Sequence, residues 1–135
     1  MMLSDTLQIA AAGLKAQSDR LRVVAENLAN ADATGRTPDE LPYRRKLVTF
    51  RNVLDRQLGI EVVKVVERGY DNSDFNLRFD PNHPAADAGG YVKYPNVNPI
   101  VELMDMREAR RGYEANLSVV EVTRTMLQRT LDILR

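Results

Sequence analysis

The chain has 135 residues, of which 44% are hydrophobic and 28% are charged, a size and composition typical of one folded soluble domain. Its 19 basic and 19 acidic residues balance, and they balance again within residues 1–30, 31–99 and 100–135. Because none of these three parts carries a net charge, nucleic acid and anionic membranes are poor candidates as partners. The absence of cysteine excludes disulfides and thiol chemistry.

The N-terminal segment predicts a long amphipathic helix. Its apolar positions recur in alternating steps of four and three, and only Gln17 among them is polar. These positions are Leu3, Leu7, Ala10, Leu14, Gln17, Leu21, Val24 and Leu28. This heptad spacing puts them on one stripe of a helix. We expect Ser4 or Asp5 to cap its start and Asn30 to close its end in a left-handed conformation.

The charged residues within this segment indicate that it is not a cleavable signal peptide. No stretch of the chain approaches the roughly 18 consecutive apolar residues of a membrane span.

The middle of the chain, residues 31–99, has a different composition. Several prolines exclude a long helix there: Pro38, Pro42, Pro81, Pro84 and Pro95. Valine-rich residues 60–67 and the alternating residues 75–79 predict two strands, and 91–94 predicts a short third one. Residues 80–84 (DPNHP) predict a turn. Residues 31–59 carry no pattern that predicts their conformation.

Residues 100–135 repeat the heptad spacing, and Pro99 predicts the start of a second helix. The predicted stripe comprises Leu103, Met106, Arg110, Tyr113, Leu117, Val120, Arg124, Leu127, Leu131 and Leu134. The fold class is therefore mainly α with a small β insert. We expect the terminal helices to pair as an antiparallel, coiled-coil-like hairpin. Residues 1–30 and 100–135 would form a helical assembly core, and 31–99 a loop and β-rich insert.

Two paired helices cannot cover all their own apolar residues. Several apolar side chains would remain partly exposed, among them Val23, Leu28, Val119, Val122 and Ile133. At about 25 cal/mol per Å² of apolar area, exposing several such side chains forfeits several kcal/mol, comparable with the stability of a small domain. We therefore expect obligate association with other chains. A soluble coiled-coil adaptor or regulator is the alternative that heptads alone would allow.

Gly13 lies among alanines inside the first predicted helix. Glycine within a helix costs around 1 kcal/mol against alanine, so we expect another helix to approach closely at this point.

No group of residues predicts catalysis, a cofactor or a metal ion. His83 is the single histidine and lies in the predicted 80–84 turn, and no glycine-rich phosphate loop is present. We expect this chain not to be an enzyme. The basic cluster Arg44, Arg45 and Lys46, followed by Arg51 and Arg56, is either an ion-pairing face or a site for a specific protein partner.

Two terminal motifs nevertheless resemble a known family. Residues 25–31 (AENLANA) end a leucine-rich helix, and residues 113–116 (YEAN) lie in the second one. Both resemble the terminal motifs of the rod and hook proteins of the bacterial flagellum. Further motifs resemble the short proximal-rod members in particular, namely 42–46 (PYRRK), 80–84 with 90–92 (GYV), and 95–98 (PNVN). The turn at 32–36 (DATGR) departs from the pattern of the hook members.

The resemblance implies a structural component of the flagellar basal-body rod, assembled helically around the export channel and transmitting torque. The implied partners are copies of the chain itself, other rod and basal-body proteins, and the flagellar type III export apparatus. The implied location is the rod in the periplasmic space, reached without a cleaved signal peptide.

We expect inter-subunit packing at residues of both terminal helices. These are Leu7, Gly13, Leu14, Leu21, Asn27, Leu28, Asn30, Tyr113, Glu114, Ala115, Asn116, Leu117, Val120, Leu127 and Leu131. Among them, the amides of Asn27 and Asn116 would set the register between helices, as buried polar residues do in coiled coils.

Overall fold

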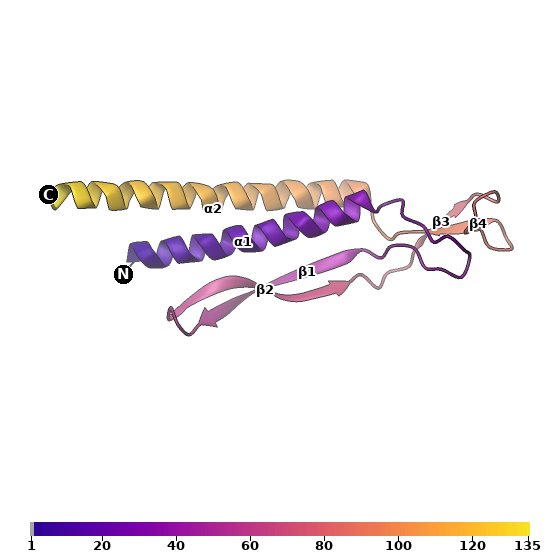
Figure 1. Ribbon diagram of the computed structural model, residues 1–135, viewed down its shortest axis with the longest axis horizontal. Helices are drawn as coiled ribbons and strands as arrows, with labels where there is room; N and C mark the ends of the chain where they lie inside the picture. Colours follow the sequence, from indigo (N-terminus) through magenta and orange to yellow (C-terminus); the bar gives the residue numbers. More distant parts are fainter. Residues whose placement is uncertain (1) are drawn as a thin grey trace. The chain divides into compact units, whose positions relative to one another are not determined.

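The computed structural model describes residues 2–135, in the order α1, β1, β2, β3, β4, α2 (Figure 1). Helix α1 comprises Met2–Ala29 and helix α2 comprises Pro99–Ile133. Between them lie β1 (Lys46–Asp55), β2 (Ile60–Tyr70), β3 (Asn76–Phe79) and β4 (Tyr91–Tyr94). The prediction of two long terminal helices around a small β-containing middle is confirmed.

The ends of both helices are defined by local hydrogen bonds. Helix α1 begins at Met2, so Ser4 and Asp5 lie in its first turn and the prediction that they cap it is wrong. Asn30 closes α1 with its side chain, whose Nδ2 donates to the Glu26 carbonyl at 2.8 Å. The predicted left-handed Asn30 is also wrong, because φ is positive only at glycines in the described chain. At α2, the Asn98 carboxamide oxygen accepts from the Ile100 N–H at 3.1 Å, just before Pro99.

The four strands form two separate two-stranded sheets, β1–β2 and β3–β4. In the antiparallel β3–β4 pair, Asn76 lies opposite Tyr94 and Phe79 opposite Tyr91. The 80–84 segment turns between them as predicted, and the Asp80 N–H donates to the Gly90 carbonyl at 2.9 Å. The φ of Gly90 is 82°, which other residues rarely adopt, and a Cβ there would lie 2.8 Å from Phe79 Cε2. Glycine is therefore required at this position.

The strand β1 was not predicted. Its side chains alternate in exposure from Lys46 to Phe50, but Arg51 and Asn52 are both exposed, which breaks the alternation. The alternation is also hidden in the sequence by the basic residues Lys46 and Arg51, which interrupt the apolar ones.

The chain divides into two compact units. Unit 1 comprises α1 up to Leu21, Val48–Glu67 and Arg107–Arg135. Unit 2 comprises Arg22–Leu47 and Arg68–Met106. Each unit therefore contains part of both helices and part of the β1–β2 hairpin.

The core is built from small side chains. Its buried apolar residues are valines and alanines, namely Ala10, Ala16, Val23, Val24, Val62, Ala85, Val92, Val97 and Ala109. Glu102 and Asn27 are among the largest side chains that are almost completely buried. A large apolar core is thus absent from the described chain, and many large aliphatic side chains lie on its surface.

Candidate assembly surface and buried polar cluster

The residues of α2 that are buried are small or polar. Glu102, Ala109 and Thr123 are at most 4% exposed, and Gly112 and Asn116 are half-buried. Glu102, Ala109, Asn116 and Thr123 are spaced by seven residues, which is a heptad position. This buried line lies one residue before the predicted positions Leu103, Arg110, Leu117 and Arg124.

Six of the ten positions in the predicted α2 stripe are exposed, so the prediction that the whole stripe faces inward is wrong. Met106, Tyr113, Val120 and Leu127 are half-buried, as a shared stripe requires. In contrast, Leu103, Leu117 and Leu131 are 51%, 40% and 60% exposed. The prediction failed because it assigned the most apolar positions to the interior, whereas small side chains allow the closer approach to α1.

The surface of α2 consequently carries a set of large apolar side chains that we call the outer stripe. It comprises Leu103, Leu117, Val119, Val122, Met126 and Leu131, all at least 40% exposed. Within unit 1, Val119, Val122 and Met126 line a groove of about 390 Å³ together with Leu3 of α1. A second groove, of about 500 Å³, lies between Met2, Leu3, Leu7 and Leu127.

Glycines permit the close approach of the two helices in unit 1. A Cβ on Gly13 would lie 2.7 Å from Asn116 Nδ2, and a Cβ on Gly112 would lie 2.9 Å from Gln17 Nε2. Each helix thus places an amide side chain against a glycine of the other. The prediction of a close helix approach at Gly13 is confirmed. Asn116 Nδ2 also donates to the Gly112 carbonyl at 3.0 Å, which fixes the amide in place.

The remaining predicted packing residues occupy varied environments. On α1, Leu7, Leu14, Leu21 and Leu28 are half-buried, as the heptad spacing predicts. On α2, Ala115 is exposed, and Glu114 is exposed and accepts from Arg110 Nε at 3.2 Å.

Asn27 is the centre of a hydrogen-bonded cluster in unit 2. Its Oδ1 accepts from the Tyr43 hydroxyl at 2.8 Å and from the Lys46 N–H at 2.9 Å. Its Nδ2 donates to the Lys46 carbonyl at 3.0 Å and to Glu102 Oε2 at 3.4 Å. One buried amide therefore joins α1, the segment before β1, and α2. Burial raises the pKa of the Tyr43 hydroxyl above its ordinary value.

Arg45 completes this buried polar cluster, which comprises Asn27, Tyr43, Arg45 and Glu102. The Arg45 Nε donates to Glu102 Oε1, and its Nη atoms lie 3.3 Å from Asp105 and 3.4 Å from Asp71. Burial disfavours the charge of Arg45, but hydrogen bonds to Glu102 and Asp71 outweigh it and raise its pKa. The Glu102 side chain is 0% exposed, so Arg45 neutralises a charge that water cannot reach.

The sequence analysis did not identify Arg45 and Glu102 as a pair. They lie 57 residues apart, and each occurs beside other charged residues that are equally plausible partners. The available signal was that Glu102 is the acidic residue in the first turn of α2, after a capping Asn98.

The predicted basic cluster does not form one continuous face. Arg44 Nη1 donates to the Asp71 carbonyl at 2.8 Å, and the Arg44 guanidinium lies 4.3 Å from the centroid of the Phe75 ring. Arg45 lies in the buried polar cluster, and Lys46 Nζ lies 3.0 Å from Glu26 Oε2. Arg44, Arg45 and Lys46 therefore all make contacts within unit 2.

His83 acts as a structural residue of its turn. Its Nδ1 accepts from the Ala85 N–H at 3.0 Å, and its Nε2 lies 3.3 Å from Thr34 Oγ1. Residues 2–135 contain no group of three or more His, Cys, Asp or Glu side chains arranged to hold a metal ion. No helix in this part of the chain is long and apolar enough to cross a membrane.

Comparison with known proteins decides the family. The family model described as "Flagella basal body rod protein" matches residues 7–35, and "Flagellar basal body rod FlgEFG protein C-terminal" matches 88–133. The flagellar basal-body rod protein FlgC of Agrobacterium fabrum is 53% identical over 98% of this chain and 96% of its own. The chain belongs to the FlgC family.

More distant FlgC proteins also align along nearly the whole length. FlgC of Salmonella typhimurium is 41% identical over 98% of each chain, and FlgC of Bacillus subtilis is 39% identical over 95% of each. The chain is therefore a structural component of the flagellar basal-body rod.

Proposed function

We propose that this chain assembles helically around the flagellar export channel and transmits torque. The single observation that carries the proposal is the outer stripe of α2. Its leucines and valines are at least 40% exposed, whereas small and polar residues of α2 lie against α1. A monomer would gain about 25 cal/mol per Å² by covering these side chains, so neighbouring chains are the expected cover.

We further propose that residues 1–30 and 100–135 act as the assembly core, with α1 and α2 paired as an antiparallel, coiled-coil-like hairpin. The opposite order of the glycine contacts supports this pairing: residue 13 lies near 116, and residue 17 near 112. Residues 31–99 would be the insert.

The packing residues proposed from the sequence fall into two classes by exposure. The half-buried leucines of α1 and Tyr113, Val120 and Leu127 of α2 hold the two helices together. Leu117 and Leu131 contact neighbouring subunits. Asn27, Asn30 and Asn116 fix the local geometry that presents those leucines.

The partners we propose are further copies of the chain, other rod and basal-body proteins, and the flagellar type III export apparatus. The location we propose is the rod within the periplasmic space, reached without cleavage of a signal peptide. Many small packing contacts between long helices would give such a rod its resistance to twisting.

The test uses a strain in which the gene for this chain is deleted. Variants of the chain are then expressed in that strain. The deletion is expected to abolish filaments and to leave basal bodies without a rod in electron micrographs. Val122→Asp is expected to do the same while keeping the stability of the purified chain within about 0.5 kcal/mol, because the side chain is 55% exposed. Glu121→Gln, on the neighbouring exposed position, is the matched control and should restore motility. Normal flagella in the deletion strain would refute the proposal.

A further inference from the structure

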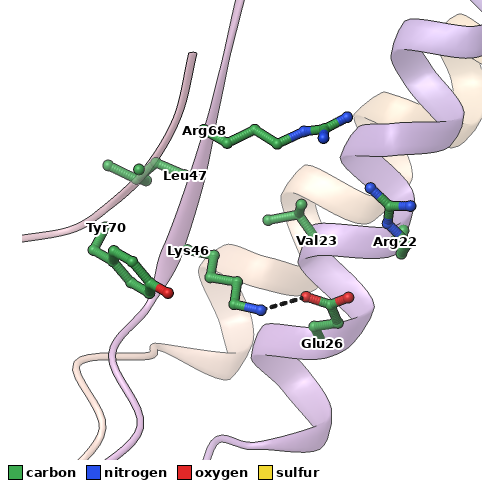
Figure 2. A pocket seen from close by; sticks show the side chains of 8 residues that line it. Arg22, Val23, Glu26, Lys46, Leu47, Arg68 and Tyr70 are labelled. Atoms are coloured by element: carbon green, nitrogen blue, oxygen red, sulfur yellow. Dashed lines mark hydrogen bonds and ion pairs between the residues drawn. The ribbon is translucent and has the colours of Figure 1, made fainter. Parts of the chain in front are cut away.

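A pocket of about 330 Å³ lies in unit 2, between the last turns of α1 and the strands β1 and β2 (Figure 2). It is lined by Arg22, Val23, Glu26, Lys46, Leu47, Arg68, Gly69 and Tyr70. This volume is sufficient for one or two side chains of another protein.

The lining carries three cations and a single carboxylate. That carboxylate, Glu26, is already bonded to Lys46 Nζ at 3.0 Å (Figure 2). Among the residues that line the pocket, cations therefore outnumber carboxylates, in a protein whose overall charge is zero. The side chains of Lys46 and Glu26 are 39% and 40% exposed, so an incoming group can reach them.

Arg22 and Arg68 come from different elements and extend toward the same side of the pocket. Figure 2 shows the Arg68 side chain reaching from its strand toward the helix that carries Arg22. Both residues already have an interaction within the chain. A guanidinium has five donors and binds a carboxylate through two of them, so each can accept a further acidic partner.

The walls beside these cations are apolar. Val23 is buried at the base, and Leu47 and Tyr70 are 38% and 59% exposed. A carboxylate carried on a hydrocarbon stem would cover this surface, whereas a free inorganic anion would leave it in contact with water.

We propose that this pocket is a docking site for an Asp or Glu side chain of a neighbouring basal-body protein. The inference rests on the proposed function, since it supposes that the chain has neighbours in a rod. It assigns to unit 2 a charge-specific contact, in addition to the apolar contacts proposed for the outer stripe.

The genetic test reverses the charge of the pocket. Arg22→Glu and Arg68→Glu are each expected to abolish swimming. Arg51→Glu and Arg56→Glu, at exposed arginines outside the pocket, should keep it. Suppressors of Arg68→Glu are expected to change an Asp or Glu of another basal-body protein to Lys or Arg. Normal swimming of both pocket variants, or suppressors confined to this chain, would overturn the proposal.

A second measurement first leaves the charged residues of the pocket unchanged and then removes the charge of one of them. A photo-crosslinking amino acid replaces Tyr70 in otherwise unaltered, assembled basal bodies. The linked peptide is expected to come from another basal-body protein and to carry an acidic residue beside the link. Arg68→Gln should lower its yield at least about tenfold, corresponding to roughly 1.4 kcal/mol. An unchanged yield, no crosslink, or a linked peptide without an acidic residue would count against the docking site.

The two proposals fail in different ways. A deletion strain with normal basal bodies contradicts the proposed function itself. A deletion strain that lacks the rod, together with swimming Arg22→Glu and Arg68→Glu strains, contradicts the docking site alone.

Discussion

Units 1 and 2 bury different kinds of side chain. In unit 2, a buried carboxylate, guanidinium, amide and phenol satisfy one another, and Val92 and Val97 pack within the same unit. In unit 1, glycines and alanines form the helix contact while large aliphatic side chains of α2 face outward. Unit 2 therefore has a specific polar interior of its own, whereas the helix contact of unit 1 leaves large apolar side chains of α2 exposed.

This difference separates two roles within one chain. Hydrogen bonds lose strength quickly with distance and angle, so the buried polar cluster allows one arrangement of the segments that it joins. Apolar contacts are less directional and can be shared among neighbouring subunits. A subunit built in this way can hold one part in a fixed arrangement and bind other subunits through the other part.

The largest effect is expected from Glu102→Ala. It removes the only fully buried one of the three carboxylates beside Arg45, and also an acceptor of the Asn27 amide. Breaking a buried ion pair on one side costs about 3–5 kcal/mol. Urea unfolding of the purified chain followed by circular dichroism measures this loss. Glu108→Ala is the control, because the Glu108 side chain is 73% exposed. Equal midpoints for the two variants would contradict the polar core of unit 2.

A smaller loss, about 2–4 kcal/mol, is expected from Asn27→Leu. The Tyr43 hydroxyl and the Lys46 N–H would both lose their acceptor, and leucine offers them none. The same variant should increase self-association of the chain, measured by light scattering, and abolish motility. Asn72→Leu, on an exposed loop residue, is the matched control. Motility unchanged in Asn27→Leu would argue against a role of this amide in setting the helix geometry.

Gly13→Ala tests the helix contact of unit 1, with an expected net loss of about 1 kcal/mol. The new methyl group would lie 2.7 Å from Asn116 Nδ2 and would displace the amide from the Gly112 carbonyl. In an Asn116→Ala background the clash is absent. The same substitution should then stabilise the helix by up to about 1 kcal/mol, through helix propensity. Thermal unfolding of the wild type, Gly13→Ala, Asn116→Ala and the double variant gives the effect of Gly13→Ala on stability in each background. The same sign of that effect in both backgrounds would exclude the contact.

The smallest effect is expected from Asp71→Asn at low pH. Hydrogen bonds from the Ser73 N–H and hydroxyl, followed by the contact with Arg45, lower the pKa of Asp71. A carboxyl with a lowered pKa stabilises the fold above its unfolded pKa of about 3.9, and this contribution disappears as the pH falls through the folded value. The wild-type chain should therefore lose more stability than Asp71→Asn between neutral pH and values below about 4. Parallel pH curves for the two chains would contradict this assignment.

The sequence predicted those parts of the fold that depend on periodicity and on local turn chemistry. Heptad spacing identified both helices, and β-rich segments identified three of the four strands. Gly13 correctly marked a close contact, because an unfavourable residue in a helix needs a local reason. Motifs at both termini correctly indicated the family.

The parts that could not be predicted depend on tertiary contacts. Helical periodicity gives the stripe of α2 but not which neighbouring position faces α1, so the heptad spacing placed Leu117 inward. Burial of Asn116 was predicted only from the family motif, not from the spacing. Strand β1 was obscured by its basic residues. The Arg45–Glu102 pair depends on segments 57 residues apart, for which the local sequence carries no pattern.

Hydrogen exchange tests the contrast between units 1 and 2 most directly. It is measured by mass spectrometry on the dilute purified chain and on isolated basal bodies. In the dilute chain we expect slow exchange in the helical parts of unit 2, near Asn27 and Glu102. We expect fast exchange in residues 107–133, since helices are marginal until they are packed. In basal bodies both regions should exchange slowly. Equal protection of residues 107–133 from exchange in the dilute chain and in the rod would contradict the account. Unit 1 would then need no neighbours to be stable.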